Sequence, residues 1–359
     1  MCLNYLIYPI IIEVSEFFTD SEKHILRVEA RELGLFGFIE KYFIQQNFPV
    51  GALIAAFSTR LAAELPPNRS NMELLPLLQL TVAKFIRHRE RLTHITTVDH
   101  VVELLGSATN IMVLTGAGVS VSCGIPDFRS PNGIYSRLGE FGLDDPQQMF
   151  DLEYFRESPQ IFYSFAKELY PSNFVPSPSH HFIRLLEARG QLLRNYTQNI
   201  DTLEQQTGIG RVLNCHGSFA TASCIRCGLQ VPGQAIKESI FDQRIPECPR
   251  CQQEAKRAKP APTDHRPPAI MKPDITFFGE NLPDAFENSF LADRKQVDLL
   301  LVMGSSLKVA PVSEVMAQLP AHVPQILINK TPNLQMNFDV QLLGNCDDII
   351  AYLCHRLQW

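Results

Sequence analysis

Apolar residues recur at helical spacing through the first quarter of the chain, from residue 22 to about residue 92. A Pro-rich break at Pro66–Asn71 separates two of the apolar groups. The pattern predicts a helical module at 33–92, preceded by a segment 1–32 of unknown role. The apolar groups are Leu33, Phe36, Ile39, Tyr42 and Phe43; Leu53, Ile54, Phe57 and Leu61; and Leu74, Leu75, Leu78, Val82 and Phe85. The basic run Arg87–Arg91 is expected to be a solvated connector, with part of a nuclear-import signal as the alternative.

From Thr97 onward the pattern changes to alternating helix and strand. Asp99–Ser107 suits a helix, and short continuous apolar runs follow at intervals, as in strands buried on both faces of a parallel sheet. The runs are Ile111–Thr115, Leu192–Gln198, Ile275–Phe278, Leu299–Met303 and Gln325–Asn329. The predicted fold class is therefore α/β, a Rossmann-like doubly wound parallel sheet with a smaller second domain. Ligands of such sheets bind at the carboxyl ends of the strands.

Two stretches interrupt this alternation and predict the domain boundaries. Residues 119–178 are expected to form a helical insert and a cofactor loop, and residues 221–270 a separate module that carries paired cysteines. The Rossmann-like domain is then assembled from 97–118, 179–220 and 271–357.

The paired cysteines predict a metal site. Cys224 and Cys227 form one Cys-x-x-Cys pair and Cys248 and Cys251 another, twenty residues further on. This spacing is close to that of tetrahedral Zn²⁺ sites with four thiolate ligands. Four protein ligands leave no position for water, so the zinc is expected to be structural.

Composition narrows the classes of function. The net charge of −6 argues against broad, sequence-independent nucleic-acid binding, and we expect no direct sequence-specific binding either. The apolar start of the chain has no basic flank, contains Pro9 and carries Glu13 and Glu16. A signal peptide or membrane span would need a different pattern, so we expect no membrane association.

A glycine-rich turn follows the first predicted strand. Gly116 and Gly118 in Gly-Ala-Gly-Val-Ser would let the backbone approach a pyrophosphate, and the turn amides would offer donors to it. The third glycine of the usual dinucleotide fingerprint is missing, because Val121 follows Ser120. Taken alone, this turn is equally compatible with a tight strand-to-helix connection that binds nothing.

Longer motifs decide between these two interpretations. Six ordered motifs between residues 97 and 357 resemble those of the sirtuin family, and in detail its nuclear class I branch. They are GAGVSVSCGIPDFR from Gly116, TQNIDTL from Thr197, CHGS from Cys215, the two Cys pairs, FGENLP from Phe278, and GSSLKV from Gly304.

The resemblance implies an NAD-dependent lysine deacetylase that forms O-acetyl-ADP-ribose, with NAD as co-substrate and structural Zn²⁺. His216 is expected to act as the general base and Asn199 as a second catalytic residue. The substrate-binding set is His216, Phe278, Gly279, Glu280 and Asn281. The cofactor-binding set is Gly116, Ala117, Gly118, Ser120, Ile125, Asp127, Phe128, Arg129, Tyr135, Gln198, Asn199, Ile200, Asp201, Gly304, Ser305, Ser306, Asn329 and Cys346.

Several of these residues could instead have a purely structural role. His216 followed by Gly would also suit a structural turn, and Asp201 could cap the following helix as well as contact a ligand. No Tyr-x-x-Arg pair occurs between Tyr135 and Arg156, so neutral acyl groups, acetyl first, are expected.

Partners and alternatives follow from the same resemblance. Acetylated histones or transcription regulators are the expected partners, and the nucleus is the expected location, with the cytoplasm as an alternative. Competing functions are mono-ADP-ribosyl transfer and a silent NAD- or peptide-binding scaffold. A dehydrogenase is disfavoured by the missing glycine.

Overall fold

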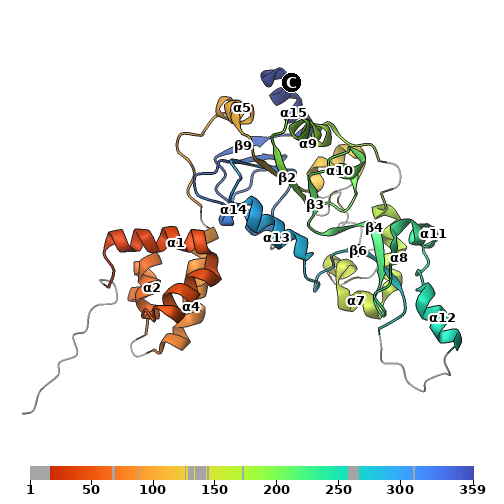
Figure 1. Cartoon of the computed structure of the whole chain (residues 1–359), viewed down its shortest axis with the longest axis horizontal. Helices are drawn as coiled ribbons and strands as arrows, with labels where there is room; N and C mark the ends of the chain where they lie inside the picture. Colours follow the sequence, from red (N-terminus) through yellow and green to blue (C-terminus); the bar gives the residue numbers. More distant parts are fainter. Residues whose placement is uncertain are drawn as a thin grey trace, which may run out of the picture. The chain divides into compact units, whose positions relative to one another are not determined.

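A computed structural model describes residues 17–66, 69–87, 89–125, 127, 133, 143, 145–171, 174–257, 267–309 and 312–359. The chain divides into two compact units, coloured along the sequence in Figure 1. One unit comprises the chain up to Arg91 with Val309–His322 and Leu334–Asn337, and the other comprises Leu92–Lys308, Val323–Asn333 and Phe338–Trp359. No helix among the described residues has the length and apolarity needed to cross a bilayer.

The first unit is helical. It contains α1 (Asp20–Ile39), the π-helical η2 (Glu40–Gln45), α2 (Val50–Phe57), α3 (Thr59–Ala63), α4 (Asn71–Arg87), η8 (Val312–Glu314) and α14 (Val315–Gln318). Its core includes Phe38, Leu53, Ile54 and Leu78, and the short α14 packs against α1 and α4.

Two expectations about this unit were wrong. The helical module begins at Asp20 rather than at 33, because Thr19 and Glu22 form a capping box that starts the helix. The connector Arg87–Arg91 is not uniformly solvated either. Arg89 is 5% exposed, and its Nη1 donates to the carbonyl of Asn337 at 3.0 Å.

The second unit is built on a six-stranded sheet. Its strands are β1 (Ile111–Thr115), β2 (Leu192–Thr197), β3 (Val212–Asn214), β7 (Leu299–Met303), β8 (Gln325–Asn329) and β9 (Val340–Leu343). All neighbours are parallel, in the order β3-β2-β1-β7-β8-β9. This is the strand order of the Rossmann fold, so the predicted fold class is confirmed. The order reverses between β1 and β7, which makes their carboxyl ends the expected ligand position.

Apolar packing on both faces explains why the strands have no polar alternation. On one face, Ile111 and Val113 lie in a core with residues of α5 (Val98–Ser107), α9 (Pro178–Ala188) and α15 (Cys346–Leu357). On the opposite face Met112 and Leu114 are equally buried. The ends of β1 are therefore fixed in position by apolar burial on two sides.

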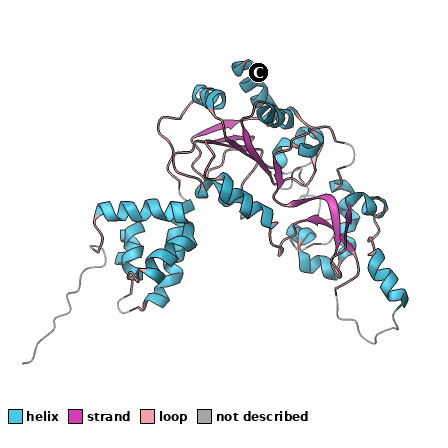
Figure 2. Ribbon diagram, in the orientation of Figure 1, coloured by secondary structure: helices cyan, strands magenta, loops and turns pink. Residues whose placement is uncertain are grey.

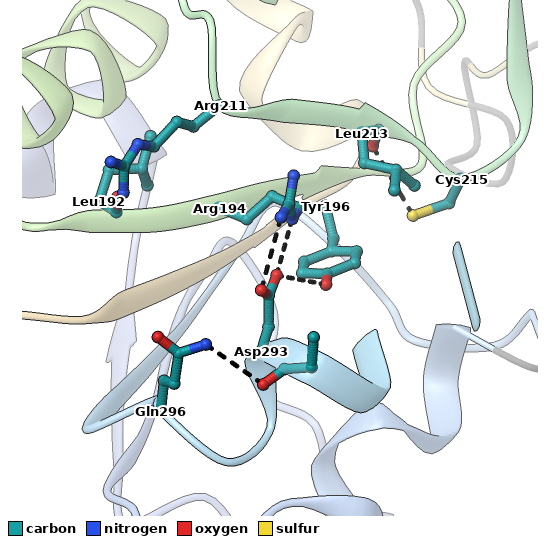
Figure 3. Close-up of polar contacts among 9 residues, drawn as sticks. Leu192, Arg194, Tyr196, Arg211, Leu213, Cys215, Asp293 and Gln296 are labelled. Carbon is teal, nitrogen blue, oxygen red and sulfur yellow. Dashed lines mark hydrogen bonds and ion pairs between the residues drawn. The ribbon is translucent and has the colours of Figure 1, made fainter. Parts of the chain in front are cut away.

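An ion pair attaches α13 (Asp284–Asp293) to β2, as Figure 3 shows. Asp293 is 3% exposed and accepts from Arg194 Nε at 2.7 Å and from the Tyr196 hydroxyl at 2.6 Å. Burial, and then the bond to Asp293, raises the pKa of Tyr196. The contact anchors the strand that leads into Gln198.

A separate three-stranded antiparallel sheet forms the smaller part of this unit, visible in Figure 2 as a second group of strands. It consists of β4 (Gly217–Cys224), β5 (Gln230–Pro232) and β6 (Met271–Ile275). The helical segments around it are η6 (Pro146–Phe150), α7 (Leu152–Glu157), α8 (Pro159–Leu169), η7 (Gly233–Ile236), α11 (Lys237–Phe241) and α12 (Pro249–Arg257).

This sheet corrects one predicted strand and two predicted boundaries. Ile275–Phe278 is not a strand of the parallel sheet, because the strand ends at Ile275 and pairs antiparallel with β4. The boundaries at 220 and 271 pass through or beside strands of this small sheet. An apolar run alone did not distinguish a parallel strand from a short antiparallel one. The sequence also gave no clear signal for the short strands β3 and β9.

Candidate active site

The turns that follow β1 and β7 pack directly against each other. Gly116 N donates to Met303 O at 3.0 Å, and Gly118 N donates to Gly304 O at 2.8 Å. A Cβ on Gly118 would lie 2.6 Å from the Gly304 Cα, and Gly304 itself has φ 62°. The glycines are thus required by this turn-to-turn contact. The amides of Gly116 and Gly118, expected as pyrophosphate donors, already bond within the protein.

A buried polar cluster lies beside these turns, at the carboxyl end of β2. Ser120 in the bend between η3 (Ala117–Val119) and η4 (Val121–Cys123) donates its hydroxyl to Asp201 Oδ2 at 2.7 Å. Asn199 Nδ2 donates to Gly116 O and to Ser120 Oγ, both at 3.2 Å. The structure therefore brings three predicted cofactor residues, Ser120, Asn199 and Asp201, into one connected cluster.

Asp201 also takes the second role that its sequence context suggested. Its Oδ1 accepts from Leu203 N at 3.1 Å, at the start of α10 (Leu203–Gln206). The intervening Thr202 has φ 62°, a left-handed conformation that is unfavourable for a β-branched residue. Local strain at Thr202 accompanies the orientation of Asp201.

The loop after β7 reaches the same place. Ser305 is 4% exposed. Its hydroxyl donates to Gln198 Oε1 at 2.6 Å and accepts from Leu307 N at 3.1 Å. The neighbouring Ser306 is exposed, and Ala117 is half-buried. Residues from the ends of β1, β2 and β7 thus line one edge of the sheet.

His216 follows β3 and lies next to this edge. Its Nδ1 is 3.0 Å from the carbonyl of Gln198. A carbonyl can only accept, so the ring hydrogen is on Nδ1 and Nε2 carries a lone pair. That Nε2 is buried and has no hydrogen-bond partner among the described residues. Burial lowers the pKa of His216, partly offset by the Gln198 carbonyl.

The segment Phe278–Asn281 is held from two sides. Phe278 N donates to Phe150 O at 2.7 Å, and Leu152 N donates to Phe278 O at 3.0 Å, as in a short strand pair. Phe278 and Glu280 are half-buried, whereas Gly279 and Asn281 are exposed.

The Glu280 side chain points into the protein rather than outward. Its Oε2 accepts from Lys272 Nζ at 2.8 Å and from Phe277 N at 2.7 Å. Lys272 Nζ also donates to Ile275 O at 2.7 Å and lies 4.2 Å from the centre of the Phe277 ring. Glu280 therefore shapes the turn before the predicted peptide-binding segment.

The remaining predicted cofactor residues are less closely connected. Asn329 ends β8, and Cys346 begins α15 with its thiol 3.6 Å from Ile328 O. Ile125, Asp127 and Ile200 are half-buried, and Ile125 N donates to Ser120 O at 3.3 Å. Phe128, Arg129 and Tyr135 lie outside the described residues.

The four paired cysteines meet as predicted. Cys224 Sγ is 3.9 Å from Cys251 Sγ, Cys227 Sγ is 3.6 Å from Cys248 Sγ, and all four sulfurs lie within 4.8 Å of one another. A tetrahedral zinc ion with Zn–S distances of about 2.3 Å needs sulfurs about 3.8 Å apart. The backbone N–H groups of Arg226 and Cys227 point at Cys224 Sγ, as in a metal-binding knuckle. The donor set fits Zn²⁺.

Four buried polar residues near the site were not predicted: Thr115, His180, Asn195 and Glu204. Thr115 Oγ1 donates toward Asn195 Oδ1 at 3.2 Å and toward Glu204 Oε1 at 3.4 Å. The available signal was Thr115 at the end of the otherwise apolar β1, and Asn195 in the middle of β2.

Comparison with known proteins gives a consistent result. A sequence model of the Sir2 family matches residues 116–311, and one described as a protein of unknown function (DUF592) matches residues 59–115. Over 319 residues the chain is 51% identical to NAD-dependent protein deacetylase sirtuin-1 of Mus musculus, covering 88% of this chain and 42% of that protein. Over 351 residues it is 43% identical to NAD-dependent histone deacetylase sir2 of Schizosaccharomyces pombe, covering 92% and 74%. The chain thus spans less than half the length of the mouse relative.

Proposed function

Because the chain belongs to the Sir2 family, we propose that it removes acetyl groups from lysine side chains of proteins. NAD would be the co-substrate, and the products would be nicotinamide, O-acetyl-ADP-ribose and the free lysine. When bound, NAD supplies an electrophilic ribose carbon to the acetyl oxygen as nicotinamide departs. The residues at the edge of the sheet bind, orient and move protons around that centre.

The state of His216 is the single observation that carries this proposal. Its Nε2 is unprotonated, buried and without a partner among the described residues, while Nδ1 is held by Gln198 O. A base that takes a proton from the ribose 2′-hydroxyl needs such a lone pair. Because burial lowers the pKa of His216, the ring is neutral and ready to accept a proton near neutral pH.

The cluster of Ser120, Asn199 and Asp201 fits the nicotinamide end of NAD. A carboxamide presents N–H donors, and Asp201 is a buried carboxylate that can accept from them. Asn199 is fixed by Gly116 O and Ser120 Oγ, so it offers a fixed orientation toward the same ligand. The cluster lies where the strand order reverses, the position at which Rossmann-like sheets bind nucleotides.

The segment Phe278–Asn281 would bind the substrate peptide as an added strand. Its backbone is already held in extended pairing on the side of Asp151, and backbone pairing reads sequence loosely. Phe278 would wall the passage of the acetyl-lysine. The buried apolar residues Phe150, Phe155 and Phe277 pack behind it and suit a neutral acyl group.

The four cysteines would hold Zn²⁺ as a structural ion. The cluster closes the module that carries β4 and α12, and four thiolates leave no open coordination position. Zinc would therefore stabilise the small sheet and take no part in proton transfer.

Acetylated histones and transcription regulators are the proposed substrates, and the nucleus the proposed location. Relatives from Schizosaccharomyces pombe and Drosophila melanogaster are named histone deacetylases, which supports this choice. We propose no direct sequence-specific contact with nucleic acid.

The test is an incubation of the zinc-replete protein with an acetyl-lysine peptide, with and without NAD. Peptide mass and free nicotinamide are measured together, and a His216→Ala variant is compared with a variant of the exposed His355, His355→Ala. We expect one nicotinamide released per acetyl group lost, only with NAD, and a collapse only in His216→Ala. Nicotinamide release with ADP-ribose attached to protein would instead indicate mono-ADP-ribosyl transfer. No consumption of NAD by folded protein would indicate a scaffold.

A further inference from the structure

Behind Asp201 lies a second group of buried titratable side chains that the proposed mechanism does not use. It joins His180 of α9 and Glu204 of α10 to Asp201, and one nitrogen or oxygen of each lies within 4.8 Å of the others. His180 and Glu204 are fully buried, and Asp201 is 5% exposed. Within the described part of the chain, no ion pair joins either carboxylate to Lys or Arg.

The two carboxylates have different hydrogen-bond partners, and contacts with Thr197, the Glu204 backbone and Thr115 lower the pKa of Glu204 against a larger effect of burial. Asp201 accepts from the Ser120 hydroxyl at 2.7 Å and from Leu203 N at 3.1 Å. Glu204 Oε1 has a long contact of 3.4 Å with Thr115 Oγ1, and Oε2 has no partner among the described residues. Burial, and then the charge of Asp201, raises the pKa of Glu204 to about 7.

The contacts of the His180 ring indicate which of its nitrogens carries the hydrogen. Its Nδ1 accepts from the backbone N–H of Ser177 at 3.2 Å and lies 2.8 Å from the Ser177 hydroxyl, which is also 2.8 Å from Val119 O. A backbone N–H can only donate, and the hydroxyl hydrogen then points to Nδ1 rather than to Val119 O. The ring hydrogen is therefore on Nε2, which is buried and has no partner in the described part of the structure. Burial lowers the pKa of His180, so the ring is neutral. A metal ion on Nε2 would require that hydrogen to move to Nδ1, against the Ser177 donor.

Other titratable groups around the cluster do not supply a compensating positive charge. Asp347 of α15 faces His180 and accepts from Ser179 Oγ at 2.6 Å. His181 is exposed on the same helix as His180. Cys215 lies near Glu204 and Cys123 near Asp201, and burial raises the pKa of both thiols. The cluster must then limit its negative charge by holding a proton.

We propose that Glu204, as the member of the cluster that holds a proton, and His180 are positioning residues of the nicotinamide pocket, which hold the Asp201 side chain in the orientation of an acceptor for a carboxamide. The role in nicotinamide binding rests on the proposed function. The assignment of a proton to Glu204 does not depend on it. If Glu204 lost its proton, two buried charges would lie side by side. The Asp201 side chain would then turn away from Glu204, and this change removes the acceptor.

The first experiment tests the proton without any substrate. Thermal unfolding of the full chain is followed from about pH 5.5 to about pH 8.5 for wild type, Glu204→Gln and the exposed control Glu103→Gln. The raised pKa means that Glu204 stabilises the fold below the ordinary carboxyl pKa of about 4.3 and that this contribution is lost as pH rises through about 7. We expect the melting temperature of Glu204→Gln minus that of wild type to increase by roughly 5 °C from the lowest to the highest pH. An unchanged difference, as for Glu103→Gln, would overturn the proposal.

An infrared spectrum gives a second, independent readout of the same proton. At about pH 6 wild type should show a band of a buried protonated carboxyl group that disappears in Glu204→Gln and persists in Glu103→Gln. Absence of the band in wild type would contradict a shared proton. A second divalent metal bound per chain, beyond zinc, and lost in Glu204→Gln would also contradict it.

The second experiment tests the link to nicotinamide. The inhibition constant of nicotinamide is measured with NAD and acetyl-lysine peptide across the same range of pH. We expect wild type to lose affinity for nicotinamide about fivefold or more between about pH 6 and about pH 8.5, and Glu204→Gln to change less than about twofold. Parallel curves for both proteins would overturn the positioning role. If the proton is found but the protein does not consume NAD, the proposed function fails and the proton assignment stands.

Discussion

The two buried histidines of the larger unit, His216 and His180, have the same kind of side chain in opposite states. Both have an Nε2 that is buried and without a partner in the described structure. The Nδ1 of His216 donates to the carbonyl of Gln198, whereas the Nδ1 of His180 accepts from the backbone N–H of Ser177. The first histidine therefore has a lone pair on Nε2 and the second a hydrogen.

The difference shows that one backbone group determines whether a buried histidine can serve as a base. His180 is fully buried and His216 half-buried, but burial lowers the pKa of both rings, so charge does not distinguish them. The carbonyl of Gln198 lies in the loop after β2, whereas the N–H of Ser177 belongs to the capping box that begins α9. One histidine is prepared to accept a proton, whereas the other has a hydrogen on Nε2 that no described residue accepts.

The largest expected effect comes from removing the lone pair. His216→Ala should lower deacetylation by about 10²- to 10⁴-fold, the usual contribution of a general base. Exchange of labelled nicotinamide into NAD should persist, because that exchange precedes removal of the ribose proton. Both rates are measured on one preparation with intact zinc content. If exchange fell together with deacetylation, His216 would be needed to bind NAD rather than to act as a base.

The second effect concerns pH and His216. Protonation at low pH fills the lone pair, so kcat/KM should fall about tenfold per unit of pH below the pKa of the ring. Because that pKa is lowered by burial, the midpoint should lie below about 6.5, the ordinary value for histidine. The profile of kcat/KM from about pH 5 to about pH 7 measures it. A midpoint above the ordinary value would mean that a negative group stabilises the charged ring and that the proposed neutral base is wrong.

The third expected effect is a several-fold loss of nicotinamide affinity in variants of His180. It is smaller than the loss expected for a general base. His180→Gln keeps a side-chain donor, whereas His180→Phe removes it and leaves the carboxylates facing an apolar ring. We expect His180→Phe to weaken nicotinamide binding more than His180→Gln and to lower the free energy of unfolding by about 1–3 kcal/mol. Inhibition by nicotinamide and urea unfolding measure the two quantities. Equal losses in both variants would show that the ring packs there without donating.

The parts of this site that are formed by residues close together in the sequence could be predicted from it. The Cys-x-x-Cys spacing specifies two knuckles, and their four sulfurs do meet. The buried strands β1, β7 and β8 have continuous apolar runs and β2 begins with one, so their existence and parallel pairing could also be predicted. The extended motifs gave the family, and the family match confirms that interpretation.

What could not be predicted depends on contacts between distant segments. Glu280 was expected to contact peptide, yet its carboxylate is occupied by Lys272, whose position depends on the antiparallel pairing of β6 with β4. Likewise, Gly118 looked like a phosphate-binding glycine, whereas the structure shows that it makes room for Gly304. Both binding roles stay predictions, and what the sequence did not reveal is the partner within the protein, which in each case lies in another strand or loop.

The smallest expected effect tests whether strain at Thr202 helps to orient Asp201. Thr202 has φ 62° and is followed by Leu203 N, which donates to Asp201. Thr202→Gly relieves the left-handed strain but adds freedom to the unfolded chain, so the two changes, each of about 1 kcal/mol, nearly cancel. Gln243→Gly is the matched control, because Gln243 has φ 52° at the end of α11.

Both variants should therefore melt within a few degrees of wild type. Only Thr202→Gly should weaken inhibition by nicotinamide, by about two- to threefold, because Asp201 is then held by fewer constraints. Titration with nicotinamide at about pH 6.5, where Glu204 still holds much of its proton, measures this loss. If the two variants had the same affinity for nicotinamide, Ser120 and Leu203 N alone would suffice to fix Asp201, and the left-handed turn would be a by-product of the way α10 begins.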